Sequence, residues 1–94
     1  MLFFAEPLLA QVAAKARELD TSLSWVLQRA WQVGGSRIEG VRLGELVQAR
    51  RVRESLYLLT DQWAEIKERA ARDDTSMSSL VQRALVVALP ELRR

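Results

Sequence analysis

Arginines and small hydroxyl residues are the side chains best able to do chemistry in this 94-residue chain, because histidine and cysteine are both absent. Their absence removes the commonest general base, the commonest metal ligand and every thiolate site. No carboxylate pair, glycine-rich phosphate loop or nucleophile–base set stands out in the sequence. We therefore expect no enzymatic activity, no metal site and no cofactor.

Basic residues gather in residues 34–54, which read "GGSRIEGVRLGELVQARRVRE". The arginines of this stretch are Arg37, Arg42, Arg50, Arg51 and Arg53. Three glutamates in the same stretch offset them, so a solubilising surface is the default interpretation. Over the whole chain, 14 basic residues oppose 12 acidic ones. The formal net charge of +2 permits a polyanionic partner but does not require one.

The hydroxyl residues belong to a repeat with an offset of 54 residues. Residues 20–31 read "DTSLSWVLQRAW", and residues 74–85 read "DTSMSSLVQRAL". When residues 12–33 are aligned with 66–87, nine of the 22 positions are identical. Self-similarity at a fixed offset is typical of a repeated supersecondary unit.

Each unit begins with an apolar run rich in aromatic and branched residues, "MLFFA" at 1–5 and "SLYLL" at 55–59. Such runs favour β-strands, so we expect strands near 2–5 and near 55–59. Alternation along these strands points Leu2 and Phe4 inward in the first half, and Leu56 and Leu58 inward in the second.

A helix follows each strand. Pro7 suits the first turn of the first helix, and Thr60 and Asp61 are candidate caps in the second half. The expected buried positions of these two helices are Leu9, Val12, Ala16 and Leu19, and then Trp63, Ile66 and Ala70.

The "DTS" triplets should end these helices and cap a second helix in each unit, with Ser22 and Ser76 as N-caps. The apolar stripes of the second helices are Val26, Leu27, Ala30 and Trp31, and then Leu80, Val81, Ala84 and Leu85. Gly34 and Gly35 should stop the first of them. Residues 41–47 could add a short amphipathic helix, weakened by Gly44.

The order strand, helix, capped turn and helix resembles the ribbon-helix-helix family of the Arc and Met repressors. The residues that carry the resemblance are "SLYLL", "DQWAEIKERAARDD" and "TSMSSLVQRALVVAL", and "TSLSWVLQRAW" matches the last of these equally well. Proteins of this family pair two strands into an antiparallel ribbon over four interlocked helices, and they do so as dimers.

Two units in one chain imply a fused dimer, since one unit alone is too small to bury a sufficient core. The predicted fold class is mainly α with a short two-stranded antiparallel ribbon, a pseudo-dimeric ribbon-helix-helix. The units are residues 1–33 and 55–94, joined by a connector at 34–54, and they form one fold. Domain swapping between two chains through the connector is the alternative.

The resemblance implies a DNA-binding protein that regulates transcription, with double-stranded DNA as its partner. Family members lay the ribbon in the major groove and hold phosphates at helix N-termini, and both roles are physically sound. The residues expected to contact DNA are Arg53, Ser55, Tyr57 and Phe3 on the ribbon, and Ser22, Ser76, Thr21 and Thr75 at the helix starts.

The outward residues of the first strand, Met1, Phe3 and Ala5, favour a second interpretation. None of them has a hydrogen-bonding side chain, so they read bases poorly and equally suggest a protein contact or self-association. The alternative function is therefore a protein-interaction or scaffolding module that has kept the fold and lost base reading. We expect Arg29 and Arg83 on a solvated face or in ion pairs.

The expected location is the cytoplasm. No apolar run approaches the roughly 20 residues needed to span a bilayer, and the N-terminal stretch lacks the basic region of a signal peptide.

Overall fold

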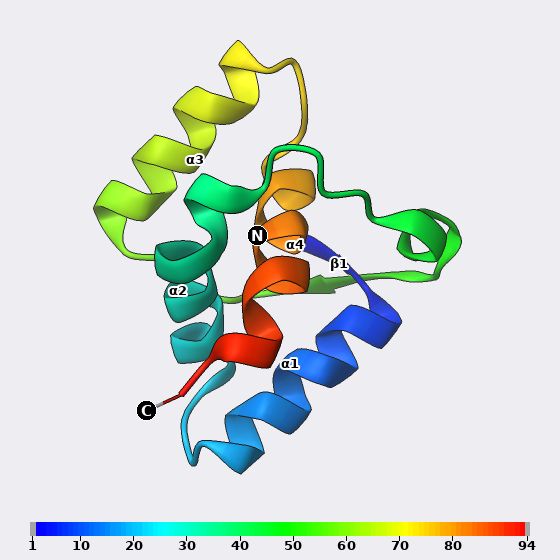
Figure 1. The fold of residues 1–94 in the computed structure, drawn as a ribbon, viewed down its shortest axis with the longest axis vertical. Helices are drawn as coiled ribbons and strands as arrows, with labels where there is room; N and C mark the ends of the chain where they lie inside the picture. Colours follow the sequence, from blue (N-terminus) through cyan, green and yellow to red (C-terminus); the bar gives the residue numbers. More distant parts are fainter. Residues whose placement is uncertain (1, 94) are drawn as a thin grey trace.

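A computed structural model describes residues 2–93, which hold four α-helices and a two-stranded antiparallel sheet (Figure 1). The elements in chain order are β1 (Leu2–Ala5), α1 (Glu6–Glu18), α2 (Leu23–Gly34), β2 (Arg51–Glu54), α3 (Thr60–Arg72) and α4 (Met77–Ala88). Short 3₁₀ helices span Gly35–Arg37, Gly44–Gln48 and Leu89–Glu91. A mainly helical fold with one two-stranded antiparallel sheet is therefore confirmed.

The core is built around α2 and α4, which lie against each other at the centre, with α1 and α3 on opposite outer sides (Figure 1). Every residue predicted for the apolar stripes of α2 and α4 is buried. Gly34 at the end of α2 lies very close to α4, since a Cβ atom there would stand 2.7 Å from the carbonyl oxygen of Ala84. The close contact between the two helices leaves no room for a side chain, which explains why the last turn of α2 contains a glycine.

The two "DTS" turns have the same structure. Asp20 and Asp74 adopt left-handed backbone conformations with φ angles of 54° and 52°. The N–H groups that follow donate back to the helix, from Thr21 to the Ala16 oxygen and from Thr75 to the Ala70 oxygen. These bonds form a Schellman motif, which satisfies carbonyls left free at a helix end.

The ribbon pairs β1 with residues earlier in the chain than predicted. The opposed residues are Leu2 and Glu54, Phe3 and Arg53, Phe4 and Val52, and Ala5 and Arg51. The prediction of a second strand at 55–59 was wrong, because β2 lies at the end of the predicted connector. The residue numbers in each pair add to 56, so in this register Ser55 would lie opposite residue 1, which is outside the described residues.

The start of α3 also differs from the prediction. Leu59 is the N-cap, and its N–H donates to the Oε1 of Gln62 at 3.2 Å, so Thr60 and Asp61 do not cap the helix. Gln62 is buried, whereas Trp63, which was expected in the buried stripe, is 38% exposed. The hydrogen bond from the Leu59 N–H satisfies the side-chain oxygen of Gln62, so this polar side chain can be buried.

The other corrections are small. Ser22 and Ser76 cap α2 and α4 as predicted, and α2 ends at Gly34. The expected connector helix is a 3₁₀ helix over Gly44–Gln48, in which Leu46 packs against the core and Val47 is exposed.

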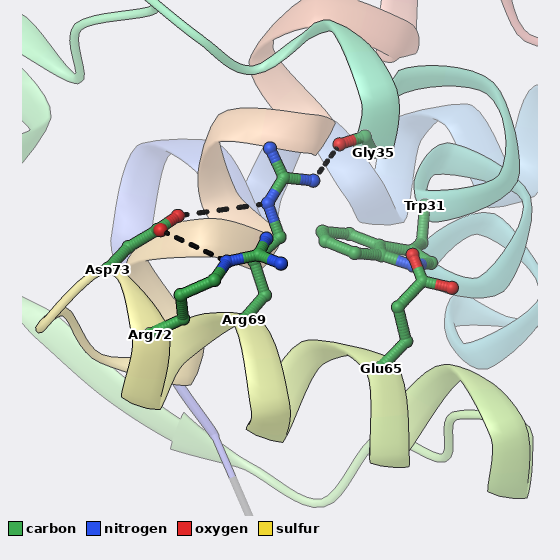
Figure 2. Close-up of polar contacts among 6 residues, drawn as sticks. All are labelled: Trp31, Gly35, Glu65, Arg69, Arg72 and Asp73. Atoms are coloured by element: carbon green, nitrogen blue, oxygen red, sulfur yellow. Dashed lines mark hydrogen bonds and ion pairs between the residues drawn. The ribbon is translucent and has the colours of Figure 1, made fainter.

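Polar contacts hold α3 on the end of α2 (Figure 2). The indole Nε1 of Trp31 donates to Glu65 at 3.2 Å. The guanidinium of Arg69 donates to the carbonyl oxygen of Gly35 and lies 6.0 Å from the centre of the Trp31 ring. Asp73 lies 3.8 Å from the Nε of Arg69, so this arginine links three elements of the chain.

Candidate nucleic-acid interface

The ribbon has an inner and an outer face, and the outer face is the candidate interface. Leu2 and Phe4 are buried, as predicted. Along the second extended run, exposure alternates from Arg51 to Leu59 and continues beyond the end of β2. The outward residues of that run are Arg51, Arg53, Ser55, Tyr57 and Leu59, and the half-buried ones are Val52, Glu54, Leu56 and Leu58.

The first strand presents less of its outer face than predicted. Phe3 is 46% exposed, but Ala5 is only 3% exposed. Ala5 belongs to the buried core cluster and lines a cleft between the connector and α4, so its predicted role as an outward contact was wrong. Met1, the third residue of that prediction, lies outside the described residues.

Phe3 and Arg53 are brought together by the sheet. They are directly opposed in the ribbon, and the guanidinium carbon of Arg53 lies 5.7 Å from the centre of the Phe3 ring. This geometry is that of a cation–π contact, which orients the guanidinium along the outer face. Of the four predicted ribbon residues, these two therefore form one unit.

Ser55 and Tyr57 lie beyond β2 in the extended segment 55–59. The N–H of Tyr57 donates to Ser24 Oγ at 3.0 Å, and its carbonyl accepts from Gln28 Nε2 at 2.8 Å. These bonds fix the backbone on α2 and leave the Tyr57 side chain 73% exposed. The segment is thus ordered by side chains of a helix instead of by a partner strand.

The serine bond has a repeat equivalent in the other half of the chain, whereas the glutamine there accepts from a different backbone group. The N–H of Phe3 donates to Ser78 Oγ at 3.0 Å, and the N–H of Ala5 donates to Gln82 Oε1 at 2.8 Å. Because Ser24 and Ser78 lie in the first turns of α2 and α4, each helix N-terminus lies beside one outward aromatic residue. Sequence reasoning missed these positioning residues, although Ser24/Ser78 and Gln28/Gln82 are identical pairs of the repeat.

The predicted phosphate-binding residues mainly serve the turns. Ser22 Oγ accepts from the N–H of Trp25, and Ser76 Oγ accepts from the N–H of Ser79, each at 3.0 Å. The N–H groups of Thr21 and Thr75 are used by the Schellman motifs. Phosphate binding at these four residues stays a prediction.

Arg83 has an environment that the sequence did not indicate. Arg29, its repeat equivalent, is exposed and donates to Gln32 at 2.9 Å, which fits the expected solvated face. Arg83 is only partly exposed, and its Nε is buried with no hydrogen-bond partner among residues 2–93. Arg83 therefore makes none of the described ion pairs, and a solvated face stays a prediction for the rest of its guanidinium.

Comparisons with family models, with curated proteins and with solved structures find no match for this chain. Within residues 2–93, no three acidic side chains gather in a way that could hold a metal ion. The helices in that range are all too short or too polar to cross a membrane.

Proposed function

We propose that this protein binds double-stranded DNA through the outer face of its ribbon, as a single-chain ribbon-helix-helix regulator. The observation that carries the proposal is the antiparallel pair β1–β2, with the first turns of α2 and α4 fixed beside it by Ser24 and Ser78. A two-stranded ribbon fits the major groove, and helix N-termini favour phosphate.

The proposed reading residues come mainly from the second half. Arg51 and Arg53 project from β2 on the exposed side, and Ser55 and Tyr57 continue that side. Arginine can make bidentate hydrogen bonds to guanine in the major groove. Phe3 supplies an apolar edge that can touch a thymine methyl. Binding is therefore asymmetric, with β2 and the segment after it providing the polar contacts.

The fused-dimer architecture is part of the same proposal. Repeat-equivalent residues make repeat-equivalent bonds, and each bond joins one half to the other. The contact between α2 and α4 is likewise a contact between the two units. These relationships support two half-units that complete one another within a single chain.

A salt-dependent titration tests the proposal. Fluorescence anisotropy with labelled mixed genomic fragments should show binding at low salt, with a shallow log–log slope of about −2 to −3, which corresponds to two or three neutralised phosphates. Arg53→Ala should weaken binding about fivefold or more. Arg17→Ala, an exposed arginine of α1, is the matched control and should change little. If the wild type does not bind at low salt, the DNA-binding proposal is wrong.

The second candidate function is a protein-interaction module, favoured by the exposure of Phe3 and Tyr57 at 46% and 73%. In that case Phe3→Ala should abolish self-association or capture of a protein partner, measured by sedimentation equilibrium and by binding assays. The DNA proposal instead expects Phe3→Ala to have little effect on affinity for DNA.

A further inference from the structure

The cleft between the connector and the first turn of α4 concentrates uncompensated positive charge. Arg42, Arg51 and Arg83 line it, and none of its lining residues is acidic. Within residues 2–93, no carboxylate lies within ion-pair distance of these three arginines. By contrast, a carboxylate partner is described for each of Arg37, Arg50, Arg69 and Arg72.

Arg83 lies at the centre of this arrangement. It lines this cleft and a second one, which contains Glu39 and Asp73, yet it pairs with neither carboxylate. Its Nε is buried and has no hydrogen-bond partner in the described part of the chain. A buried donor is costly when unsatisfied, and more so when it is charged. Neither carboxylate of the second cleft offsets that cost, so the positive charge of Arg83 is left uncompensated beside the cleft.

The polar groups around the arginines are also poised to donate. The Oγ atoms of Ser76 and Ser78 already accept backbone N–H bonds, so their hydroxyl protons remain available. The Oε1 of Gln82 accepts from the N–H of Ala5, so the NH₂ group of Gln82 is also available to donate. The cleft therefore offers many donors, and its volume of about 390 Å³ lies within the range of small-molecule sites.

From these observations we infer that the cleft binds a phosphate group. Guanidinium groups match phosphate oxygens with paired hydrogen bonds, and three positive charges suit a doubly charged anion. Arg29, the repeat equivalent of Arg83, donates to Gln32, so the arrangement around Arg83 is not repeated at Arg29. The phosphate can belong to the backbone of bound DNA or to a small phosphorylated molecule, and only the first source depends on the proposed function.

The test is a titration of the full 94-residue protein with sodium pyrophosphate at constant ionic strength, followed by the arginine Nε–Hε signals in ¹⁵N NMR spectra. The Arg83 signal should shift and saturate. Arg42→Gln should weaken pyrophosphate binding about tenfold or more, since Arg42 is exposed and its replacement leaves the core intact. Arg50→Gln is the matched control, because Arg50 is exposed and lies 3.7 Å from Glu6. Its affinity should equal that of the wild type.

A phosphate site is ruled out if the Arg83 signal does not saturate, or if Arg42→Gln and Arg50→Gln bind pyrophosphate equally well. Arg83→Met, checked for folding by circular dichroism, should also lose binding, and retained affinity would overturn the assignment.

A parallel titration with a DNA duplex separates this inference from the proposed function. If the duplex binds but pyrophosphate does not, and Arg42→Gln leaves duplex affinity unchanged, the cleft assignment fails and the DNA proposal stands. If pyrophosphate saturates Arg83 and no duplex binds, the reverse holds, and the ligand is a small phosphorylated molecule. Displacement of the duplex by pyrophosphate in the wild type but not in Arg42→Gln identifies a backbone phosphate.

Discussion

Ser24 and Ser78 occupy the same position in the two repeats, and each accepts a backbone hydrogen bond at 3.0 Å from an extended residue of the other half. The donors, Tyr57 and Phe3, are themselves repeat equivalents. The two halves therefore hold one another's extended segments through a reciprocal pair of serines, close to the face proposed to bind DNA.

Removing either serine hydroxyl should loosen the segment that it holds. We expect Ser24→Ala and Ser78→Ala each to lower the free energy of unfolding by about 1 kcal/mol, since a backbone N–H loses its acceptor. Urea denaturation measures the loss, and hydrogen exchange should quicken at Tyr57 in the first variant and at Phe3 in the second. Ser36→Ala, at an exposed serine with no described hydrogen bond, is the control. Equal exchange rates in all three variants would contradict the reciprocal arrangement.

The left-handed turn residue of the second repeat can be improved. Asp74 has a φ angle of 52° at the end of α3, where a side chain is strained and a negative charge opposes the helix dipole. Asp74→Gly should raise the free energy of unfolding by about 0.5 kcal/mol, because glycine relieves the strain but gives the unfolded chain more freedom. Asp74→Ala removes the charge but keeps the strain, so it should be the less stable of the two variants by chemical denaturation. The reverse order would contradict this account of the turn.

Gly34→Ala should destabilise the protein although alanine is the better helix former. The added Cβ would stand 2.7 Å from the backbone oxygen of Ala84, which cannot move without shifting α4. We expect a net loss of about 1–3 kcal/mol, seen as a fall of several degrees in the midpoint of thermal unfolding. An increase in stability, as helix propensity alone would give, would show that α2 and α4 lie farther apart than described.

Arg69 should control the attachment of α3. Its guanidinium contacts the Trp31 ring and the Gly35 carbonyl. The Arg69 side chain is only 22% exposed. We therefore expect Arg69→Met to lower the free energy of unfolding by about 1–2 kcal/mol, because a charged hydrogen bond is lost. Hydrogen exchange should quicken along α3 more than along α1. Arg72→Met is the matched control, because Arg72 lies 3.6 Å from the same Asp73 but its side chain is 68% exposed. If both variants behave alike, the contacts of Arg69 do not hold the helix.

The local features of this fold could be predicted from the sequence, and the long-range ones could not. The caps at Ser22 and Ser76 and the apolar stripes of α2 and α4 depend on residues within a turn or two of one another. The position of β2 depends on the register between segments about 50 residues apart, which the repeat suggested wrongly. The burial of Gln62 in place of Trp63 depends on a backbone bond at Leu59 that no periodicity reveals.

The same division applies to the candidate site. Alternation correctly indicated that Arg53, Ser55 and Tyr57 face outward, because it is a property of any extended backbone. Ala5 and Arg83 both line the cleft that forms where the connector passes β1 and α4. That path is determined by packing and not by any local motif, so the arginine cleft could not be predicted.

The serine and glutamine bonds also bear on the tendency of the ribbon to aggregate. A two-stranded ribbon has open edges, and unpaired backbone groups along such edges recruit strands from other molecules. Here Ser78 and Gln82 cover N–H groups of β1, while Ser24 and Gln28 cover the backbone of Tyr57. Side chains of the two central helices thereby take the place of neighbouring strands. They occupy backbone groups that could otherwise pair with another molecule, and the outward side chains of the ribbon stay accessible.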